Sequence, residues 1–192
     1  MTKKIRHMSK KMDILSVFLR DYHNSYSGRE IARLTKVSPQ TALIVLSDLL
    51  KEKIVLVEAE GRNKKYSLNL KDLRTKLMLA LVESYKARFF AGKLHLTLIL
   101  DKLLPLAETI IVFGSFAKGR EKESSDLDLV VIGVKNKKKF NEVKRIFPRE
   151  INPHFVTWTE FVRMSNSNLF TEIKKDHLVY GNAYKLVEVY GS

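Results

Sequence analysis

The sequence predicts a mixed α/β (α+β) protein made of two domains, and three observations lead to this prediction. The first 70 residues follow the order helix, helix, helix and strand hairpin. Residues 71–91 have apolar side chains at helical spacing and no strong helix breaker. Residues 92–192 alternate apolar strands with helices, which predicts a β-sheet flanked by helices. We therefore expect domains at 1–70 and 92–192, joined by a helical linker at 71–91.

The composition is that of a basic globular protein. The chain has 192 residues and a net charge of +14, and residues 1–70 carry 14 Lys and Arg against 7 Asp and Glu. A basic surface attracts polyanions such as nucleic acid, although the same charge also serves solubility. The absence of cysteine excludes disulfides and thiolate metal sites. No apolar run approaches the roughly 18–20 residues that span a bilayer, and the basic start lacks the apolar core of a secretory signal. We expect a cytoplasmic protein without a membrane partner.

The first two helices are predicted from apolar spacing and from a capping pattern. Residues 12–22 have one apolar stripe at helical spacing, and a loop is expected at His23–Tyr26. Ser27 and Glu30 then have the spacing of a capping box, which starts a second, short helix. The stripe of the first helix consists of Ile14, Leu15, Phe18 and Leu19.

The third helix is predicted from its start signals. Ser38 is a good N-cap and Pro39 suits the first helical position, so we expect a helix from there to about Lys51. Two strand-like runs follow at Ile54–Glu58 and Lys64–Leu68, separated by a turn. The inward residues of the third helix are expected to be Ala42, Val45, Leu46 and Leu49.

This order of elements resembles a winged helix-turn-helix over about sixty residues. The resemblance implies that the third helix enters the major groove of duplex DNA and that the hairpin, the wing, contacts the backbone. A domain used only for protein contacts is the alternative, and Glu58 and Glu60 near the wing weaken the case for DNA. The outward residues are expected to be Gln40, Thr41, Ile44, Ser47 and Lys51 on the helix, and Arg62, Lys64 and Lys65 on the wing.

The segment after the wing predicts two helices separated near Gly92. Leu73, Leu77, Leu81 and, further along, Phe89 share one face at helical spacing. Winged-helix proteins often form homodimers through such a helix. A core within one chain explains the same residues equally well.

The segment that holds the candidate catalytic and binding residues begins with an apolar strand at Thr109–Phe113. Gly114 lets the backbone approach a ligand closely, and the Ser115 hydroxyl with the amides that follow can hold a phosphate. Ten residues separate Ser115 from Asp126, where a second strand begins. Asp126 and Asp128 are two positions apart and therefore share a face of that strand. Two carboxylates so close favour a divalent cation with oxygen ligands, such as Mg²⁺.

Gly114, Ser115, Asp126 and Asp128 together resemble the pattern of the DNA polymerase beta-like nucleotidyltransferase superfamily, especially its minimal members. The resemblance reaches weakly from about Glu108 to Gly181, and it implies a mixed β-sheet flanked by helices. It implies that the two aspartates hold Mg²⁺, which bridges the phosphates of a nucleoside triphosphate. An acceptor hydroxyl then attacks the α-phosphorus and pyrophosphate leaves. The family usually has an arginine after the glycine-serine pair, and the nucleotide-binding candidates at that place are Lys118 and Arg120.

The family's third carboxylate has no obvious counterpart. On the strand expected at Ile151–Val156, His154 stands where that acid is expected and becomes the third catalytic candidate, because imidazole can act as a general base. A polar surface or core histidine is the alternative. Glu150 and Glu160 are substitutes only if the strand register differs. Pro153 predicts an edge strand or an irregular one.

These features leave three functions open. The protein transfers a nucleoside monophosphate to an unknown acceptor, or it is a non-catalytic DNA-binding regulator whose transferase-like domain binds nucleotide or dimerises. The minimal members of the family also suggest an antitoxin-like role on a partner protein. The basic run Lys135–Lys144 is a solvated helix or faces a polyanion.

Overall fold

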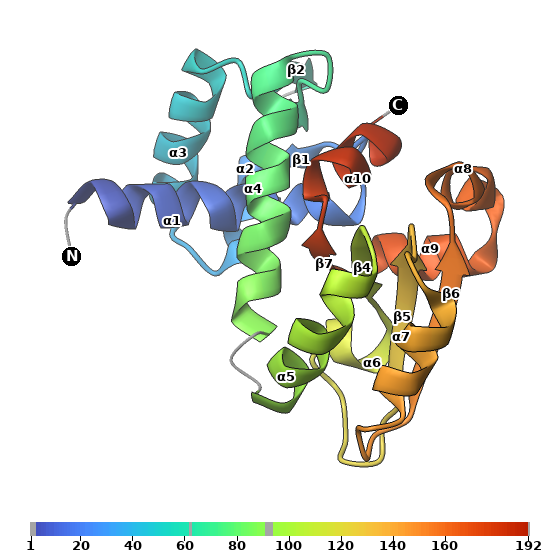
Figure 1. Cartoon of the computed structure of the whole chain (residues 1–192). Coiled ribbons are helices and arrows are strands. Elements are labelled where there is room, and N and C mark those ends of the chain that lie inside the picture. The colour runs from blue at the N-terminus through green and yellow to red at the C-terminus, as the bar shows by residue number, and fades with distance from the viewer. Residues whose placement is uncertain (1–2, 62, 91–93, 192) are drawn as a thin grey trace. The chain divides into compact units, whose positions relative to one another are not determined.

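The computed structural model describes residues 3–61, 63–90 and 94–191 (Figure 1). These residues form helices and two separate β-sheets, which confirms the predicted mixed α/β fold class. Among the described helices, none combines the length and the apolar character that a bilayer crossing requires.

Contacts divide the chain into two compact units. The N-terminal unit comprises Met1–Glu83 and Tyr184–Ser192, and the C-terminal unit comprises Ser84–Ala183. The division falls within the long helix α4 (Leu73–Phe90). The domain limits expected from the sequence remain a prediction.

The N-terminal unit combines helices with a three-stranded antiparallel sheet of order β1-β3-β2. Tyr26, which we expected in a loop, begins the first strand because it pairs with Tyr66. Besides the first part of α4 and most of α10 (Ala183–Tyr190), the elements of this unit are α1 (Lys3–Leu15), β1 (Tyr26–Ser27), α2 (Gly28–Thr35), α3 (Pro39–Lys51), β2 (Val55–Glu60) and β3 (Asn63–Leu68).

The first helix differs from the predicted one at both ends. It begins at Lys3, and its α-helical part ends at Leu15, where a 3₁₀ turn (Ser16–Arg20) follows. The Ser16 hydroxyl donates a hydrogen bond to the Asp13 carbonyl at 2.6 Å. Such side-chain bonds compete with the α-helical ladder, so the change of helix type has a local cause.

Both predicted helix starts are confirmed. Ser27 accepts the Glu30 amide while the Glu30 carboxylate accepts the Ser27 amide, which completes the capping box of α2. Ser38 accepts the Thr41 amide at 3.1 Å, and Pro39 is the first residue of α3. The predicted inward residues of α1, the 3₁₀ turn and α3 are buried, namely Ile14, Leu15, Phe18, Leu19, Ala42, Val45, Leu46 and Leu49.

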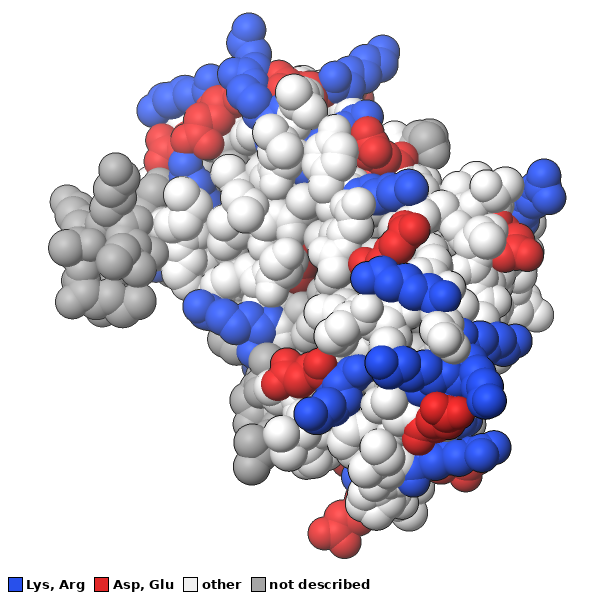
Figure 2. Space-filling view, viewed as in Figure 1, with Lys and Arg blue, Asp and Glu red and all other residues white. Residues whose placement is uncertain are grey.

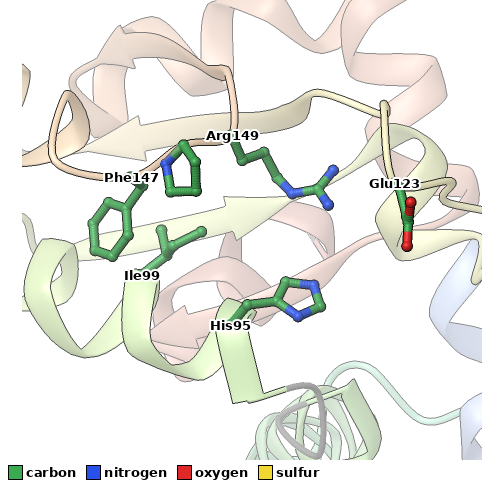
Figure 3. A pocket seen from close by; sticks show the side chains of 6 residues that line it. His95, Ile99, Glu123, Phe147 and Arg149 are labelled. Atoms are coloured by element: carbon green, nitrogen blue, oxygen red, sulfur yellow. The ribbon is translucent and has the colours of Figure 1, made fainter.

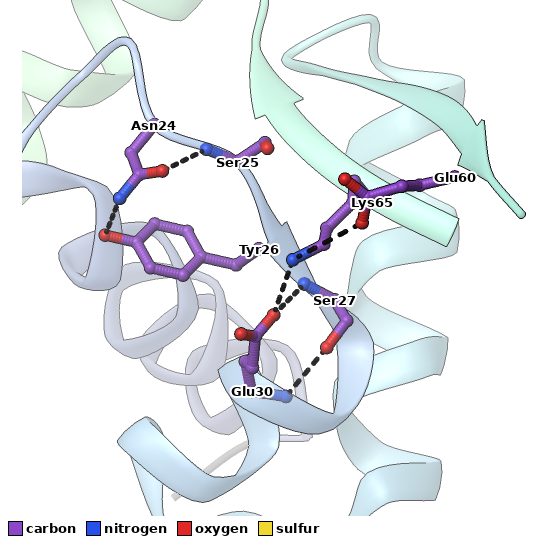
Figure 4. A network of polar contacts seen from close by, with 7 residues as sticks. All are labelled: Asn24, Ser25, Tyr26, Ser27, Glu30, Glu60 and Lys65. Atoms are coloured by element: carbon purple, nitrogen blue, oxygen red, sulfur yellow. Dashed lines mark hydrogen bonds and ion pairs between the residues drawn. The ribbon is translucent and has the colours of Figure 1, made fainter. Parts of the chain in front are cut away.

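Glu30 also links α2 to β3 through the network that Figure 4 shows. Its carboxylate lies 3.3 Å from the Lys65 ammonium, which is 3.8 Å from the Glu60 carboxylate. The bonds from the Ser27 amide and hydroxyl, followed by the one from Lys65, lower the pKa of Glu30 from 4.5 to about 2. Glu30 therefore stays ionised in the folded unit at a pH where the unfolded chain takes up a proton.

Acid should therefore destabilise the N-terminal unit through Glu30. A carboxyl with a lowered pKa stabilises the fold above its unfolded pKa, and this contribution is lost as the pH falls through about 4.5 toward 2. We expect Glu30→Gln to lower the free energy of unfolding at pH 7 by about 0.5–1 kcal/mol, the usual range for a half-exposed capping residue. Its pH dependence between about 5 and 2 should flatten. Thermal melting followed by circular dichroism measures both, with the exposed Glu58→Gln as control, and an unchanged acid dependence would contradict the assignment.

The C-terminal unit is built on a four-stranded mixed sheet of order β6-β5-β4-β7. The strand β5 is antiparallel to β4 and parallel to β6, and Pro153 lies on β6 at the edge, as expected from its missing amide proton. Besides the second part of α4 and the 3₁₀ turns Leu104–Leu106 and Met164–Asn166, the elements of this unit are α5 (Leu94–Leu103), β4 (Thr109–Val112), α6 (Gly114–Ala117), β5 (Leu127–Ile132), α7 (Lys137–Lys144), β6 (Ile151–Val156), α8 (Trp158–Arg163), α9 (Asn168–Lys175) and β7 (Leu178–Gly181).

The main apolar core of this unit lies on one face of the sheet. Leu127, Leu129 and Val131 of β5 belong to it, together with residues of α5 and with Phe140 of α7. Because side chains alternate along a strand, Asp128 lies on the opposite face. The sheet thus places a polar strand position away from the main core.

The connector forms two helices, α4 and α5, as expected, although Gly92 and the Phe89 side chain lie outside the described residues. Leu73, Leu77 and Leu81 follow one face of α4 and are 59%, 50% and 56% exposed. The predicted apolar face therefore exists on α4, and its described leucines are not buried.

Candidate active site

The bend after β4 brings its backbone against the carboxylate of Asp128. Gly114 has a φ of +71°, and a Cβ atom at this position would lie 2.6 Å from Oδ2 of Asp128. The Phe113 amide also donates to the Asp128 carbonyl at 3.1 Å. Only glycine combines this backbone angle with so close an approach. The glycine-serine bend and the second aspartate therefore meet in space.

Asp128 is half-buried on β5, and a hydrogen-bond partner of its side chain lies on β6. Asn152 is its partner in the parallel register, and its side chain is hydrogen-bonded to the Asp128 carboxylate. Burial raises the pKa of Asp128 above 3.8, and the negative charge of Asp126 raises it further. The bond from Asn152 and the proximity of His154 act in the opposite direction. The net rise shows a carboxylate that lacks full compensation of its charge.

Asp126 precedes β5 and is exposed. Its charge acts on Asp128, so the two carboxylates lie within electrostatic reach of each other. Carboxylate and amide oxygens are the hard donors that Mg²⁺ prefers, so this donor set fits the ion. Among the described residues, no group of three or more His, Asp or Glu side chains is placed to hold a metal. Water and nucleotide phosphates would have to complete the coordination of an ion held here.

On β6, His154 lies two residues after Asn152, which is the partner of Asp128. It is the partner of Val130, it is exposed, and its ring centroid is 6.0 Å from that of Phe113. Asn152 and not His154 therefore lies directly beside Asp128. The sequence does not single out Asn152, because alternation gives Asn152 and His154 the same face and only the register separates them.

The remaining nucleotide-binding candidates surround the four-residue helix α6. Ser115 is half-buried, and its carbonyl accepts the amide of Arg120, whose side chain is exposed. The Lys118 ammonium lies 3.3 Å from the carboxylate of Glu172 on α9. Glu172 also bonds Lys175, and these bonds lower the pKa of Glu172. Lys118 would have to exchange this partner for a phosphate in order to bind nucleotide.

A cavity of about 260 Å³ lies in the same unit, and Figure 3 shows its lining. Arg149 forms part of its wall, stacks at 5.0 Å over the Phe116 ring and donates to the carbonyl of Ser125. Ser125 immediately precedes Asp126, so Arg149 helps to hold the loop that carries the first aspartate. The lining consists of His95, Ile99, Glu123, Phe147, Pro148 and Arg149.

The proposed DNA-contacting residues lie in the N-terminal unit, and they differ in exposure and in the ion pairs that they make. On α3, Thr41 is half-buried and the Lys51 ammonium lies 3.5 Å from Asp48. On the wing, Lys64 is exposed, Lys65 is held by Glu30 and Glu60, and Arg62 lies outside the described residues. A shallow depression on α3 is lined by Gln40, Leu43, Ile44, Ser47, Asp48 and Lys51.

Comparison with known families bears on the C-terminal unit, where strand, bend and aspartate pair come together. Residues 96–181 match the family described as the nucleotidyltransferase domain. The match includes all the strands of this unit and both aspartates, so this part of the chain is similar to a nucleotidyltransferase domain. No curated protein matches the chain.

A solved structure, described as that of TrmBL2, an archaeal chromatin protein with a novel mode of DNA binding, is similar at 15% identity. The similarity covers 85% of this chain and 67% of that chain, with a TM-score of 0.28.

The close approach of Gly114 to Asp128 makes a substitution there informative. Gly114→Ala adds a Cβ atom where the carboxylate now lies and places alanine at a φ of +71°. We expect a loss of about 1–3 kcal/mol in stability from the backbone angle, and a displaced Asp128 that binds divalent cations at least about tenfold more weakly. Mn²⁺ titration followed by electron paramagnetic resonance measures the second effect. Gly61→Ala, at a φ of +58° with open space around it, is the control for the backbone angle alone, and equal cation binding by both variants would contradict the geometry.

Proposed function

We propose that the protein is a magnesium-dependent nucleotidyltransferase that carries a winged-helix nucleic-acid-binding domain. The observation that supports this most is the approach of the Asp128 carboxylate to the Gly114 bend, with Asp126 within electrostatic reach, inside the segment that matches the nucleotidyltransferase family. A bend and two acids at one place suit a ligand that brings both a polyphosphate and a cation.

The two aspartates would hold the ion from the start of β5. When bound, Mg²⁺ would neutralise the charge of the nucleotide phosphates and fix their position. Asn152 would keep the Asp128 carboxylate oriented through its side-chain bond. The Ser115 hydroxyl would donate to a phosphate oxygen at the bend.

The transfer itself replaces a phosphoanhydride bond of the nucleotide by a phosphate ester bond to the acceptor. The acceptor hydroxyl oxygen attacks the α-phosphorus, the bond from that phosphorus to the bridging oxygen breaks, and pyrophosphate leaves with the electron pair. Lys118 and Arg120, at the end of α6, would supply positive charge to the departing phosphates. His154 would take the acceptor's proton, since its exposed imidazole lies on the same face of the sheet as Asp128.

An assay with labelled nucleotides tests this function. The full chain would be incubated with α-labelled ATP, CTP, GTP or UTP, with the protein itself and a short RNA bearing a free 3′-hydroxyl as acceptors. We expect magnesium-dependent label transfer and pyrophosphate release with at least one nucleotide. Absence of transfer together with absence of magnesium-dependent nucleotide binding would contradict the proposal. Binding without transfer would favour the second function below.

A non-catalytic DNA-binding regulator is the second candidate, and the lack of a described third acid beside the aspartates favours it. In this function, Gln40, Thr41, Ser47 and Lys51 of α3 would read a major groove. Arg62, Lys64 and Lys65 would contact the backbone, although Lys65 is engaged by Glu30. The exposed Leu43 and Ile44 on the same helix would contact thymine methyl groups, or a protein partner if the domain does not bind DNA.

Duplex binding separates the two uses of the winged helix. We expect Lys51→Glu with Lys64→Glu to weaken binding of a mixed-sequence duplex at least about tenfold at 0.1 M salt, because each lost phosphate contact reduces the salt-dependent term. The charge-matched control is Lys71→Glu with Arg163→Glu, both exposed and outside these elements. Fluorescence anisotropy measures the affinity. Equal weakening by both variants would mean that net charge alone acts.

A homodimer through α4 belongs to the same proposal. Leu73, Leu77 and Leu81 form an exposed stripe at a spacing of four residues, which suits packing against a second helix. Sedimentation velocity of the full chain and of Leu77→Lys tests it, and a monomer in both cases would contradict it.

A further inference from the structure

The strongest unassigned concentration of charge lies on the C-terminal unit, around α7. Residues 135–149 contain seven Lys and Arg against the single acid Glu142. Figure 2 shows Lys and Arg side chains extended over the region where Figure 1 labels α5 and α7. We call the exposed part the α7 basic surface; it consists of Lys135, Lys137, Lys138, Lys139 and Arg145.

Three lysines of this surface lie at a position where their charge destabilises the helix. Lys137, Lys138 and Lys139 occupy the first turn of α7, which has no acidic residue. Cations at a helix N-terminus oppose the helix dipole, so this turn destabilises α7 and relies on the Asn136 side chain, which caps the Lys139 amide at 2.9 Å. A sequence that breaks a local rule without structural gain is typical of a functional surface.

Internal contacts occupy only some of these cations. The Lys137 ammonium lies 4.8 Å over the Phe155 ring, and the Lys135 ammonium donates to the Pro105 carbonyl at 3.0 Å. Lys138 and Lys139 are exposed and make no ion pair with any residue that the structure describes. They are therefore available to an external anion.

The cationic run continues toward the candidate active site. The Lys144 ammonium donates to the carbonyl of Ile151, the first residue of β6, at 3.0 Å. Arg149 donates to the carbonyl of Ser125, directly before Asp126. Basic residues thus follow the chain from the first turn of α7 to the end of the sheet where β5 and β6 begin.

We propose that the α7 basic surface binds the phosphate backbone of a nucleic acid, as a contact separate from the winged helix. The surface presents closely spaced cations with a single acid, and its apolar parts are the alkyl stems of lysines rather than a groove. Such a surface fits an extended polyanion with evenly spaced charges. The inference goes beyond the proposed function, because it requires neither nucleotide transfer nor DNA binding by α3.

The test uses the full chain carrying Lys51→Glu and Lys64→Glu, so that the winged helix contributes little. The probes are a labelled 20-nucleotide single-stranded RNA and a DNA duplex of the same length. Adding Lys138→Glu and Lys139→Glu should weaken binding of at least one probe by about tenfold or more at 0.1 M salt and reduce the slope of log affinity against log salt by about 1–2. The matched control adds Lys71→Glu and Arg163→Glu, which change the net charge equally, and should leave the affinity within about threefold.

The melting temperature of the same variant distinguishes a binding role of these lysines from a structural one. Glutamate in the first turn of α7 favours the helix dipole, so the melting temperature should stay equal or rise while binding falls. Three results would overturn the proposal: unchanged binding of both probes, equal weakening by the control pair, or binding of phosphatidylserine vesicles that depends on Lys138 and Lys139 while neither nucleic acid binds.

Discussion

Replacing Asp126 and Asp128 together with alanine is expected to abolish magnesium-dependent nucleotide transfer, with a loss of about 10³-fold or more. A bound divalent ion supplies several kcal/mol of charge stabilisation in the transition state, and each 1.36 kcal/mol corresponds to a factor of ten in rate. Removing both carboxylates leaves no described pair of acids at the Gly114 bend. Pyrophosphate release under saturating nucleotide and Mg²⁺ measures the effect.

The control is Glu123→Ala with Glu142→Ala, which removes two exposed carboxylates from the same unit. It should retain transfer within about threefold. Transfer that survives in Asp126→Ala with Asp128→Ala would place the chemistry elsewhere.

The melting temperature of an Asp128 variant should show whether this aspartate serves function or stability. Burial raises the pKa of Asp128, so its ionised form costs folding free energy above that raised pKa. We therefore expect Asp128→Asn to keep or raise the melting temperature at pH 7 while transfer is lost. For the same reason, cation binding should weaken at a higher pH than for an ordinary aspartate as the solution is acidified. A lower melting temperature for Asp128→Asn would contradict this assignment.

Replacing Asn152 with aspartate is the change with the largest expected gain. Asn152 lies beside Asp128 in the β5–β6 register, so the substitution assembles three carboxylates around one point. An additional unit charge about 4 Å from a cation contributes up to about 4 kcal/mol at an effective dielectric constant of about 20, so Mn²⁺ affinity should rise at least about tenfold. Isothermal titration calorimetry measures it, and transfer activity should rise if the third acid limits catalysis.

Without metal, the same variant should be less stable, because three like charges repel one another, and added Mg²⁺ should restore it. Asn166→Asp, at an exposed position of the same unit, is the matched control and should change neither property. His154→Asp tests the alternative position for the third acid. A larger gain in Mn²⁺ affinity for His154→Asp than for Asn152→Asp would contradict the prediction, because the bound ion would then lie further along β6.

Local features of the N-terminal unit could be predicted from the sequence because their causes lie within a few residues. Ser27 and Glu30 form a capping box, and Ser38 with Pro39 starts a helix, through bonds that span three positions. The extent of α1 was not predicted, since residues 3–11 are mostly polar and basic and their two apolar side chains, Ile5 and Met8, are too few to define a helical face by themselves. The pairing of Tyr26 with Tyr66 joins residues forty positions apart, so no local pattern indicates it.

In the C-terminal unit, the sequence by itself determined which residue types are available: a glycine-serine bend, a strand with two aspartates, and a strand with Asn152 and His154 on one face. The period of a strand is two, so alternation cannot decide which of those last two lies beside Asp128. Only the tertiary structure decided it, through the parallel register that pairs Asp128 with Asn152. It likewise decided that Lys65 of the predicted wing is held by Glu30, because an ion pair depends on which distant side chains the fold brings within reach.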